Sequence, residues 1–367
     1  GHPQRVGGGG AGATRRRGEQ GLSRARDSPS QRTVMTELPS PHLLFLGDVT
    51  NPLDAKTAMG LRDWRPERCI GQYRLPGCAV DLGLPEMDFR EAATAGARSV
   101  VIGVAPSGGV LKAEWVSVLA EAIRSGLSLV SGLHRKLSEE SELVEAAAAS
   151  GRQLIDIRVP PASISIATGR QRSGKRLLMV GTDCCVGKKY SALLLHKALQ
   201  ERGIAATFRA TGQTGILIAG GGIPMDAVVS DFLSGAAETL TPDAASDHWD
   251  VIEGQGSLFH PAYAAVTIGL LHGSQPDAMV LCHGSGRTSI DEYEDYPVPD
   301  LRECVTQYEQ AARVTNRVSS IVGISLNTQG LSDDEALSAC RDASTLTGLP
   351  CVDPMRHALD PIIDALP

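Results

Sequence analysis

The sequence predicts an α/β fold with two domains, each built on a parallel β-sheet. From His42 onward, short apolar runs alternate with stretches of helical periodicity, and this alternation is typical of β-α units. In the second half, one apolar run leads directly into a glycine-rich loop and then a helix. A length of 367 residues also exceeds what one core usually supports. We therefore expect a Rossmann-like N-terminal domain followed by a P-loop NTPase-like domain.

The expected boundaries follow from composition and periodicity. Residues 1–34 contain seven arginines and almost nothing apolar, so residues 1–38 are expected to be a disordered tail. Residues 39–170 are assigned to the Rossmann-like domain and residues 171–367 to the P-loop-like domain. Met35 directly precedes the first folded-looking segment, which favours an upstream extension, with a basic targeting tail as the alternative.

Charge and composition exclude several functional classes. A formal net charge of −7 argues against a nucleic-acid partner, and no apolar run reaches the roughly 18 to 20 residues that span a bilayer. We expect a cytoplasmic protein that forms homo-oligomers and acts on small molecules. The eight cysteines include no C-x-x-C pair, so neither a zinc cage nor a disulfide framework is indicated.

The N-terminal elements are read from short apolar runs and helical spacing. Strands are expected at Leu43–Leu46, Ser99–Val104 and Leu127–Val130, and helices at Trp115–Arg124 and Glu139–Ala149. A long loop region is expected between Asn51 and Gly77, where it would cover a site. Nicotinamide binding is not favoured, because the full G-x-G-x-x-G fingerprint is missing.

The strongest motif is the loop between the strand Arg176–Val180 and the helix that follows it. In this context the backbone N–H groups of the loop and the positive end of the helix converge on phosphate oxygens. Lys188 would reach a bridging or terminal phosphate. The expected phosphate-binding residues are Gly181, Thr182, Asp183, Cys184, Val186, Gly187, Lys188 and Lys189.

Two departures distinguish this loop from the common pattern. Five residues separate its glycines instead of four, and Lys189 stands where a Ser or Thr hydroxyl normally binds Mg²⁺. An ammonium cannot ligate a cation, so no metal is expected. Lys188 and Lys189 together would neutralise a diphosphate. Asp183 is expected to shape the loop, and Cys184 and Cys185 are either small loop-fitting side chains or, less favoured, a nucleophile.

Several polar segments follow other predicted strands of the second domain. Glu253 follows a strand that begins at Asp250, His283 follows the strand Ala278–Cys282, and Asn327 ends the strand Ser320–Leu326. The segment Thr211–Gly215 is expected as a polar loop after the strand Ala206–Arg209. Because sites in open α/β sheets form at the carboxyl ends of strands, we expect these groups to surround the ligand.

The spaced loop, the E-G-x-G segment at Glu253 and the strand ending in Asn327 together resemble the dethiobiotin synthetase branch of P-loop enzymes. Over about residues 42–366 the chain is more similar to the DgcN family. The motifs that carry this resemblance are Thr50–Thr57, Gly103–Pro106, Ser131–His134, Gly181–Cys184, Ala210–Gly215 and Glu253–Ser257. The resemblance implies a D-glutamate N-acetyltransferase that uses acetyl-CoA and works beside a dehydrogenase acting on the N-acetylated product.

Such a reaction assigns roles to the candidate residues. Glu253 and His283, expected at neighbouring strand ends, are the candidates for the base that removes the amine proton. Arg209 and Arg287 are candidates for binding the carboxylates of an acidic amino acid. Gln213, Thr214, Gln255 and Ser257 would supply neutral hydrogen bonds. We expect the site at the junction of the two domains.

Two other functional classes stay open at this point. An ATP-dependent ligase or kinase resembling dethiobiotin synthetase would require Mg²⁺-dependent turnover, which Lys189 disfavours. A non-catalytic nucleotide-binding module would bind its ligand without turnover.

Overall fold

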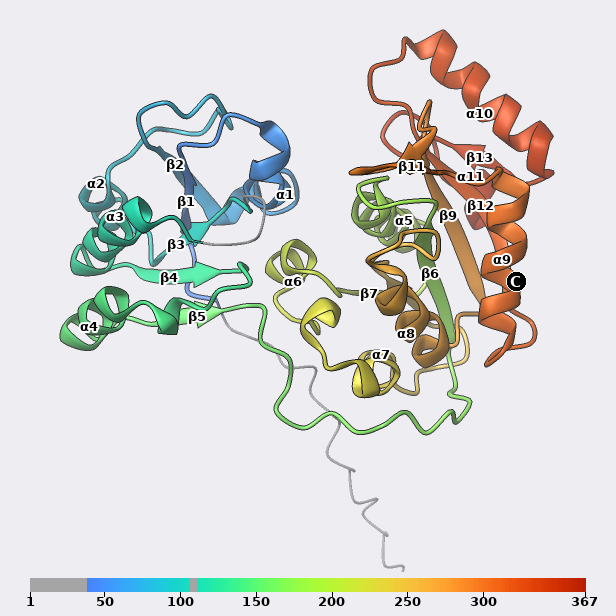
Figure 1. Cartoon of the computed structure of the whole chain (residues 1–367), viewed down its shortest axis with the longest axis horizontal. Helices are drawn as coiled ribbons and strands as arrows, with labels where there is room; N and C mark the ends of the chain where they lie inside the picture. The colour runs from blue at the N-terminus through green and yellow to red at the C-terminus, as the bar shows by residue number, and fades with distance from the viewer. Residues whose placement is uncertain (1–37, 106–110) are drawn as a thin grey trace, which may run out of the picture. The chain divides into compact units, whose positions relative to one another are not determined.

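The N-terminal half forms a five-stranded parallel sheet in the order β2-β1-β3-β4-β5 (Figure 1). The computed structural model describes residues 38–105 and 111–367. The strands are β1 (His42–Gly47), β2 (Cys69–Arg74), β3 (Ser99–Ile102), β4 (Ser128–Ser131) and β5 (Leu154–Asp156). This is a doubly wound order: β2 lies on one side of β1, and β3, β4 and β5 follow one another on its other side. The Rossmann-like prediction is therefore confirmed.

The helices of this half are α1 (Lys56–Trp64), α2 (Phe89–Thr94), α3 (Ala113–Arg124) and α4 (Ser141–Ser150). The expected long loop between Asn51 and Gly77 is wrong, because α1 and β2 occupy most of it. Strand β2 pairs with β1 along its length. Because it contains Gly, Gln and Tyr, it does not form the apolar run by which the other strands were predicted. The tail and the loop at Pro106–Gly109 lie outside the described residues.

The C-terminal half forms a six-stranded parallel sheet in the order β13-β12-β9-β6-β8-β7. Its strands are β6 (Lys175–Gly181), β7 (Ala206–Arg209), β8 (Trp249–Ile252), β9 (Ala278–Gly284), β12 (Ser320–Asn327) and β13 (Cys351–Val352). A short antiparallel hairpin joins β10 (Ser289–Ile290) to β11 (Tyr293–Pro297). The central strand β6 leads into the glycine-rich loop, as expected for the P-loop class.

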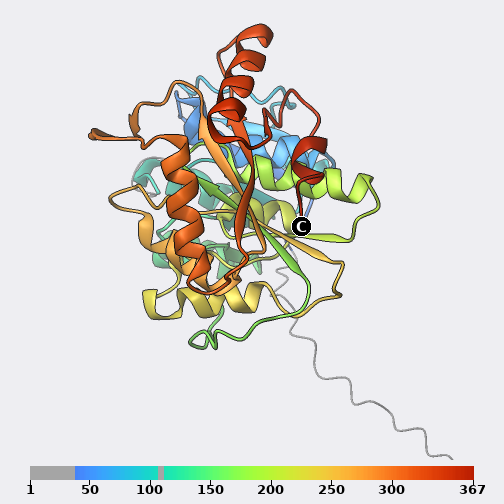
Figure 2. The ribbon, with the colours of Figure 1, turned by 90° about the vertical axis from the view of Figure 1, so that its right-hand side faces the viewer.

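Helices cover both faces of this sheet, as Figure 2 shows. They are α5 (Lys188–Glu201), α6 (Gln213–Ala219), α7 (Leu233–Leu240), α8 (Ala264–Ser274), α9 (Leu301–Arg313), α10 (Asp333–Thr347) and α11 (Asp360–Ile363). Because side chains of a strand alternate between faces, Leu178 and Val180 pack with α7, α8 and α9, while Leu177 and Met179 pack with α5 and α11. Burial on both faces explains why these strands read as continuous apolar runs.

Two boundaries differ from the sequence prediction in ways that affect the site. Strand β9 continues through Gly284, so His283 belongs to a strand and not to the loop after it. The segment expected as a polar loop at Thr211–Gly215 turns into α6 at Gln213. The helix was not predicted because it begins with polar and glycine residues. Its next three residues, Ile216, Leu217 and Ile218, are buried.

The two halves share a hydrophobic core. The cluster built on β1, β3 and β4 also contains residues of the second half, namely Leu193, Ala210, Ile216, Leu217 and Ile218. Helix α1 packs against α6, and Arg65 Nε donates a hydrogen bond to the Ile218 carbonyl at 2.7 Å. The described residues accordingly form one compact unit.

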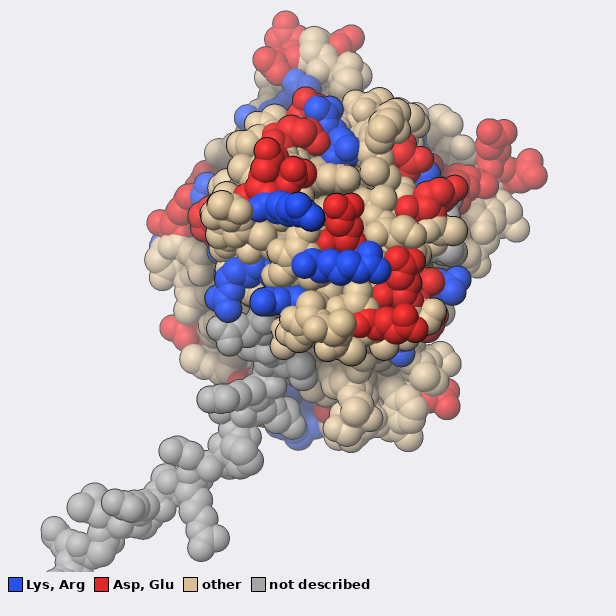
Figure 3. Space-filling model, turned by 90° about the vertical axis from the view of Figure 1, so that its left-hand side faces the viewer, with Lys and Arg blue, Asp and Glu red and all other residues tan. Residues whose placement is uncertain are grey.

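Acidic and basic side chains are interspersed on the face drawn in Figure 3. Elsewhere in the described residues, ion pairs join neighbouring segments, for example Arg124 on α3 with Glu142 on α4 and Arg74 with Glu86. Among the residues that the structure describes, no helix is both long and apolar enough to cross a bilayer.

The hydroxyl of Tyr308 on α9 predicts a measurable stability effect. It is fully buried, donates to the Gly181 carbonyl at 2.6 Å and accepts from the Leu258 N–H at 3.1 Å. Tyr308→Phe leaves these buried groups with one partner fewer, so the free energy of unfolding should fall by about 1–3 kcal/mol. Denaturant titration measures this change. The control is Tyr296→Phe, at a side chain that is 51% exposed, and equal stability of both variants would contradict the assignment.

Candidate functional site

The phosphate-binding loop leaves β6 at Gly181 and enters α5 at Lys188. Gly187 caps the helix with φ 98°, a left-handed conformation that glycine adopts without strain. Lys188 is buried, and its Nζ donates to the Asp183 carbonyl at 2.7 Å. The lysine is therefore folded into its own loop, close to the backbone that would surround a phosphate.

The base of the loop is held by two buried hydroxyls. Ser257 Oγ and Tyr308 Oη both donate to the Gly181 carbonyl, at 2.8 and 2.6 Å. Ser257 has no exposed surface, and its Oγ also accepts from the Phe259 N–H at 3.2 Å. The hydroxyl predicted to bind substrate is thus engaged in fixing the loop.

Asp183 organises the other side of the loop. Its fully buried carboxylate accepts from the backbone N–H groups of Cys184 at 2.6 Å and Asp291 at 2.8 Å, and from Arg287 Nη1 at 2.5 Å. This geometry agrees with the expected role of Asp183 in shaping the loop. It also gives Arg287, a predicted carboxylate binder, an acidic partner within the chain.

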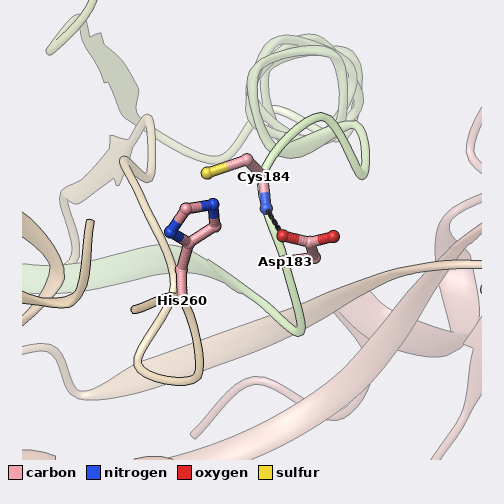
Figure 4. A group of neighbouring side chains, drawn as sticks. All are labelled: Asp183, Cys184 and His260. Atoms are coloured by element: carbon pink, nitrogen blue, oxygen red, sulfur yellow. Dashed lines mark hydrogen bonds between the residues drawn. The ribbon is translucent and has the colours of Figure 1, made fainter. Parts of the chain in front are cut away.

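Figure 4 shows Asp183, Cys184 and His260 together, with one possible ligand atom of each within 4.8 Å of the others. These residue types can ligate a metal, but both Asp183 oxygens already accept hydrogen bonds. Burial raises the pKa of the Cys184 thiol to about 11. A protonated thiol is a poor nucleophile, so the geometry favours the loop-fitting role of this cysteine.

Glu253 directly follows β8, the strand next to β6 in the sheet, and is almost completely buried. Its Oε2 accepts from the N–H groups of Thr211 at 2.9 Å and Gly212 at 3.0 Å, whereas Oε1 has no hydrogen bond among the described residues. Burial raises the pKa of this carboxyl, opposed by those N–H groups and by Lys189. A methyl group at Gly215 would lie 2.2 Å from Oε2, so glycine is required there. The predicted substrate-binding residue Gln255 also contacts this turn, because its Nε2 donates a hydrogen bond to Thr211 Oγ1 at 3.2 Å.

His283 lies at the opposite flank of the loop. Its Nδ1 is 2.8 Å from Thr182 Oγ1, and burial together with Arg287 lowers its pKa, which favours the neutral ring. The expectation that Glu253 and His283 occupy neighbouring strand ends needs correction. Strand β6 lies between β8 and β9, and the phosphate-binding loop therefore separates the two candidate bases.

Lys189 faces a different environment from Lys188. Its ammonium lies 5.0 Å from the Tyr190 ring centre, and a methyl group at Gly60 of α1 would be 3.3 Å from Nζ. Burial lowers its pKa to about 8. Close by, Thr57 Oγ1 and Thr214 Oγ1 hydrogen-bond at 3.0 Å between α1 and α6. Lys189 therefore points to the seam between the two halves, which we define as the contact of α1 with α5 and α6.

The remaining predicted residues also have partners within the chain. Arg209 Nε donates to the buried Asp250 at 2.7 Å. With its amide nitrogen placed toward Gly132, Gln213 donates to that carbonyl at 2.8 Å and accepts from Arg158 Nη2 at 3.2 Å. Arg158 also pairs with Asp226. Gln213, the first residue of α6, thus links the two halves through Gly132 and Arg158.

Sequence reasoning missed the contribution of α1. Thr57 and Gly60 lie against Thr214 and Lys189 of the second half, although Thr57 and its partner Thr214 are 157 positions apart in the chain. Lys56 and Thr57 end the segment Thr50–Thr57, which the sequence analysis used only for the family resemblance. That segment was the available signal, but spacing alone does not show which loop of the second half it meets.

Comparisons with known proteins agree with this architecture. Residues 73–160 match a family model described as a domain of unknown function, DUF1611_N Rossmann-like domain, and residues 165–363 match its DUF1611_C P-loop domain. A crystal structure of a DUF1611 family protein from Anabaena variabilis is 32% identical, with a TM-score of 0.81, over 89% of this chain and 99% of that one.

Two curated relatives carry the name D-glutamate N-acetyltransferase. The protein from Tritonibacter scottomollicae is 52% identical and the one from Pseudoalteromonas sp. is 47% identical, each over 327 residues that cover 89% of this chain and 98% of the relative. Matches of this extent, together with the Rossmann-like and P-loop halves, show that the chain belongs to the DUF1611 family.

Proposed function

We propose that this protein is an N-acetyltransferase that moves an acetyl group to the amine of D-glutamate. The observation that carries the proposal is the match to two relatives of that name at 52% and 47% identity, each covered over 98% of its length. The geometry then suggests how its residues take part in the reaction.

Acetyl-CoA is the proposed acetyl donor. The loop Gly181–Lys188 and the Lys188 ammonium provide donors for a diphosphate, which is the part of coenzyme A that this motif can hold. The diphosphate does not react during acetyl transfer, so it needs charge neutralisation but no activation. The replacement of the metal-binding hydroxyl by Lys189 is consistent with that use and disfavours an ATP-dependent ligase or kinase.

Glu253 is the proposed general base. The substrate nitrogen forms a bond to the thioester carbon, the carbon–sulfur bond breaks, and CoA leaves as a thiolate. The amine proton passes to Oε1 of Glu253, which has no hydrogen bond among the described residues. A carboxyl whose pKa is raised by burial is a stronger base than an exposed one. His283 is assigned to the loop, where it positions Thr182.

Cytoplasmic localisation, self-association and a partner dehydrogenase that oxidises the N-acetylated product are further parts of the proposal. The partner dehydrogenase rests on the family resemblance, and the cytoplasmic placement is consistent with eight scattered cysteines that indicate no disulfide framework.

Glu253→Gln should lower kcat for D-glutamate by about 10²- to 10⁴-fold, the usual contribution of a general base. The amide oxygen of glutamine still accepts from Thr211 and Gly212, so CoA binding should be preserved. Thiol release measures turnover, and calorimetry measures CoA binding. The control is Glu201→Gln, at a side chain 65% exposed near the end of α5. Wild-type turnover in Glu253→Gln would reject this base.

The same carboxylate predicts an acid limb in the pH profile. Protonated Glu253 cannot accept the amine proton, so kcat/KM should fall as the pH drops through its pKa. Because burial raises that pKa, the fall should begin above the usual carboxyl range of about 4. The limb should be absent from the residual activity of Glu253→Gln. If Glu253→Gln retains the same acid limb, the limb is caused by another group and the assignment to Glu253 is wrong.

A shortened donor tests the proposed contact between the loop and the diphosphate. Wild-type protein should use acetyl-CoA with a lower KM than S-acetylpantetheine, which lacks the diphosphate. Lys188→Ala should remove most of this preference, because the contact that distinguishes the donors is gone. Activity should survive EDTA. An unchanged preference in Lys188→Ala, or Mg²⁺-dependent ATP turnover, would contradict the assignment.

A further inference from the structure

Two lysines at the seam have no acidic partner within reach. No carboxylate oxygen lies within 4.0 Å of Lys56 or Lys189 in the part of the chain that the structure describes, whereas most neighbouring arginines are paired. The internal segment 106–110 that is not described contains no acidic residue. Lys189 is half-buried, and a cation removed from water without a close counter-ion is costly, whereas Lys56 is exposed. Lys189 is therefore suited to an anionic ligand, and Lys56 can add a second positive charge to the same site.

Lys189 lies against the helix that carries Lys56. Lys56 and Gly60 are four residues apart on α1 and therefore share one helix face. The Lys189 ammonium approaches that face at the position of Gly60, where a methyl group would be only 3.3 Å away. Lys56 is close enough that its charge contributes to the lowered pKa of Lys189. The absence of a side chain at Gly60 lets the Thr214 methyl group and the Lys189 ammonium approach α1 closely.

The acidic groups nearest to this pair are already occupied. Asp63 accepts from Tyr190 Oη at 3.0 Å and from Arg62 at 2.8 Å. One oxygen of Glu253 accepts from two backbone N–H groups, and its charge acts on Lys189 only from beyond 4.0 Å. The seam thus offers two cations on one side and a single carboxylate oxygen, Glu253 Oε1, on the other.

We propose that Lys56 and Lys189 bind a carboxylate of the acceptor amino acid and so select an acidic acceptor. The proposal rests on the proposed function. The carboxylate would lie between the ammonium groups, with the amine directed toward Glu253 Oε1. Lys189 would then serve the acceptor instead of sharing the diphosphate with Lys188, and the acceptor site would require both halves of the chain, since Lys56 belongs to α1 and Lys189 to α5.

The test compares Lys56→Met and Lys189→Met with Lys197→Met, which removes a lysine 63% exposed on α5. Each variant is assayed by thiol release with D-glutamate and acetyl-CoA varied in turn. We expect KM for D-glutamate to rise at least tenfold in the first two variants, with KM for acetyl-CoA and the melting temperature within the range of the control. Lys56→Arg should recover part of the lost affinity, because it restores the charge.

Two results would overturn the proposal. A rise in KM for acetyl-CoA, with KM for D-glutamate unchanged, would return Lys189 to the diphosphate. Unchanged values for both substrates in both variants would show that the lysines bind neither. D-glutamine provides a second readout: if the side-chain carboxylate is the one bound, the preference for D-glutamate over D-glutamine collapses in the variants. Equal weakening of both acceptors would show that the lysines bind the α-carboxylate and would overturn the selection of an acidic acceptor.

Equilibrium binding separates this proposal from the proposed function. Calorimetry with D-glutamate, in the presence of CoA, reports acceptor binding without turnover. Wild-type protein that binds D-glutamate but releases no thiol would reject the transferase, while loss of that binding in Lys56→Met and Lys189→Met would still support the carboxylate site. Wild-type protein that does not bind D-glutamate would reject the carboxylate site as well.

Discussion

The buried carboxylate of Glu253 holds the start of α6, and the arrangement of the seam depends on that contact. By accepting from the N–H groups of Thr211 and Gly212, one oxygen ties the end of β8 to the turn before the helix. The turn in this way directs Thr214 toward Thr57 and Gln213 toward Gly132. The close approach of Gly215 to the same oxygen leaves room for nothing larger. A single buried acid thus aligns the two halves and presents its second oxygen to the site.

The glycine-rich loop shows how one substitution changes the use of a widespread motif. The loop, its capping glycine and its lysine keep the features that hold phosphate. At the next position, Lys189 introduces a positive charge where other members of the class coordinate a metal. That charge is directed to α1 and not into the loop. The motif is consequently suited to retaining a phosphorylated carrier while the chemistry takes place beside it.

The arginines of the site illustrate why residue type alone does not identify a ligand contact. Arg209 and Arg287 match the geometry of a carboxylate, but each is engaged by a buried aspartate, Asp250 or Asp183. A buried acid must be neutralised, and the arginines supply that charge. Lys56 and Lys189, which are less selective donors, lack such partners among the described residues and are left for an external anion.

Local sequence was sufficient for the apolar strands of both sheets, for several helices and for the phosphate-binding loop. Long apolar strands, helical spacing and the G-x₅-G-K pattern are properties of neighbouring residues, and these predicted β6, α5 and the parallel order of the fold class. Strand β2 and helix α6 were missed because their polar and glycine residues carry no such period. Only the tertiary structure decided that β6 separates Glu253 from His283, that Asp183 engages Arg287, and that α1 meets Lys189. These contacts join residues far apart in the chain, and they depend on how the strands are ordered and the helices packed, which local spacing does not encode.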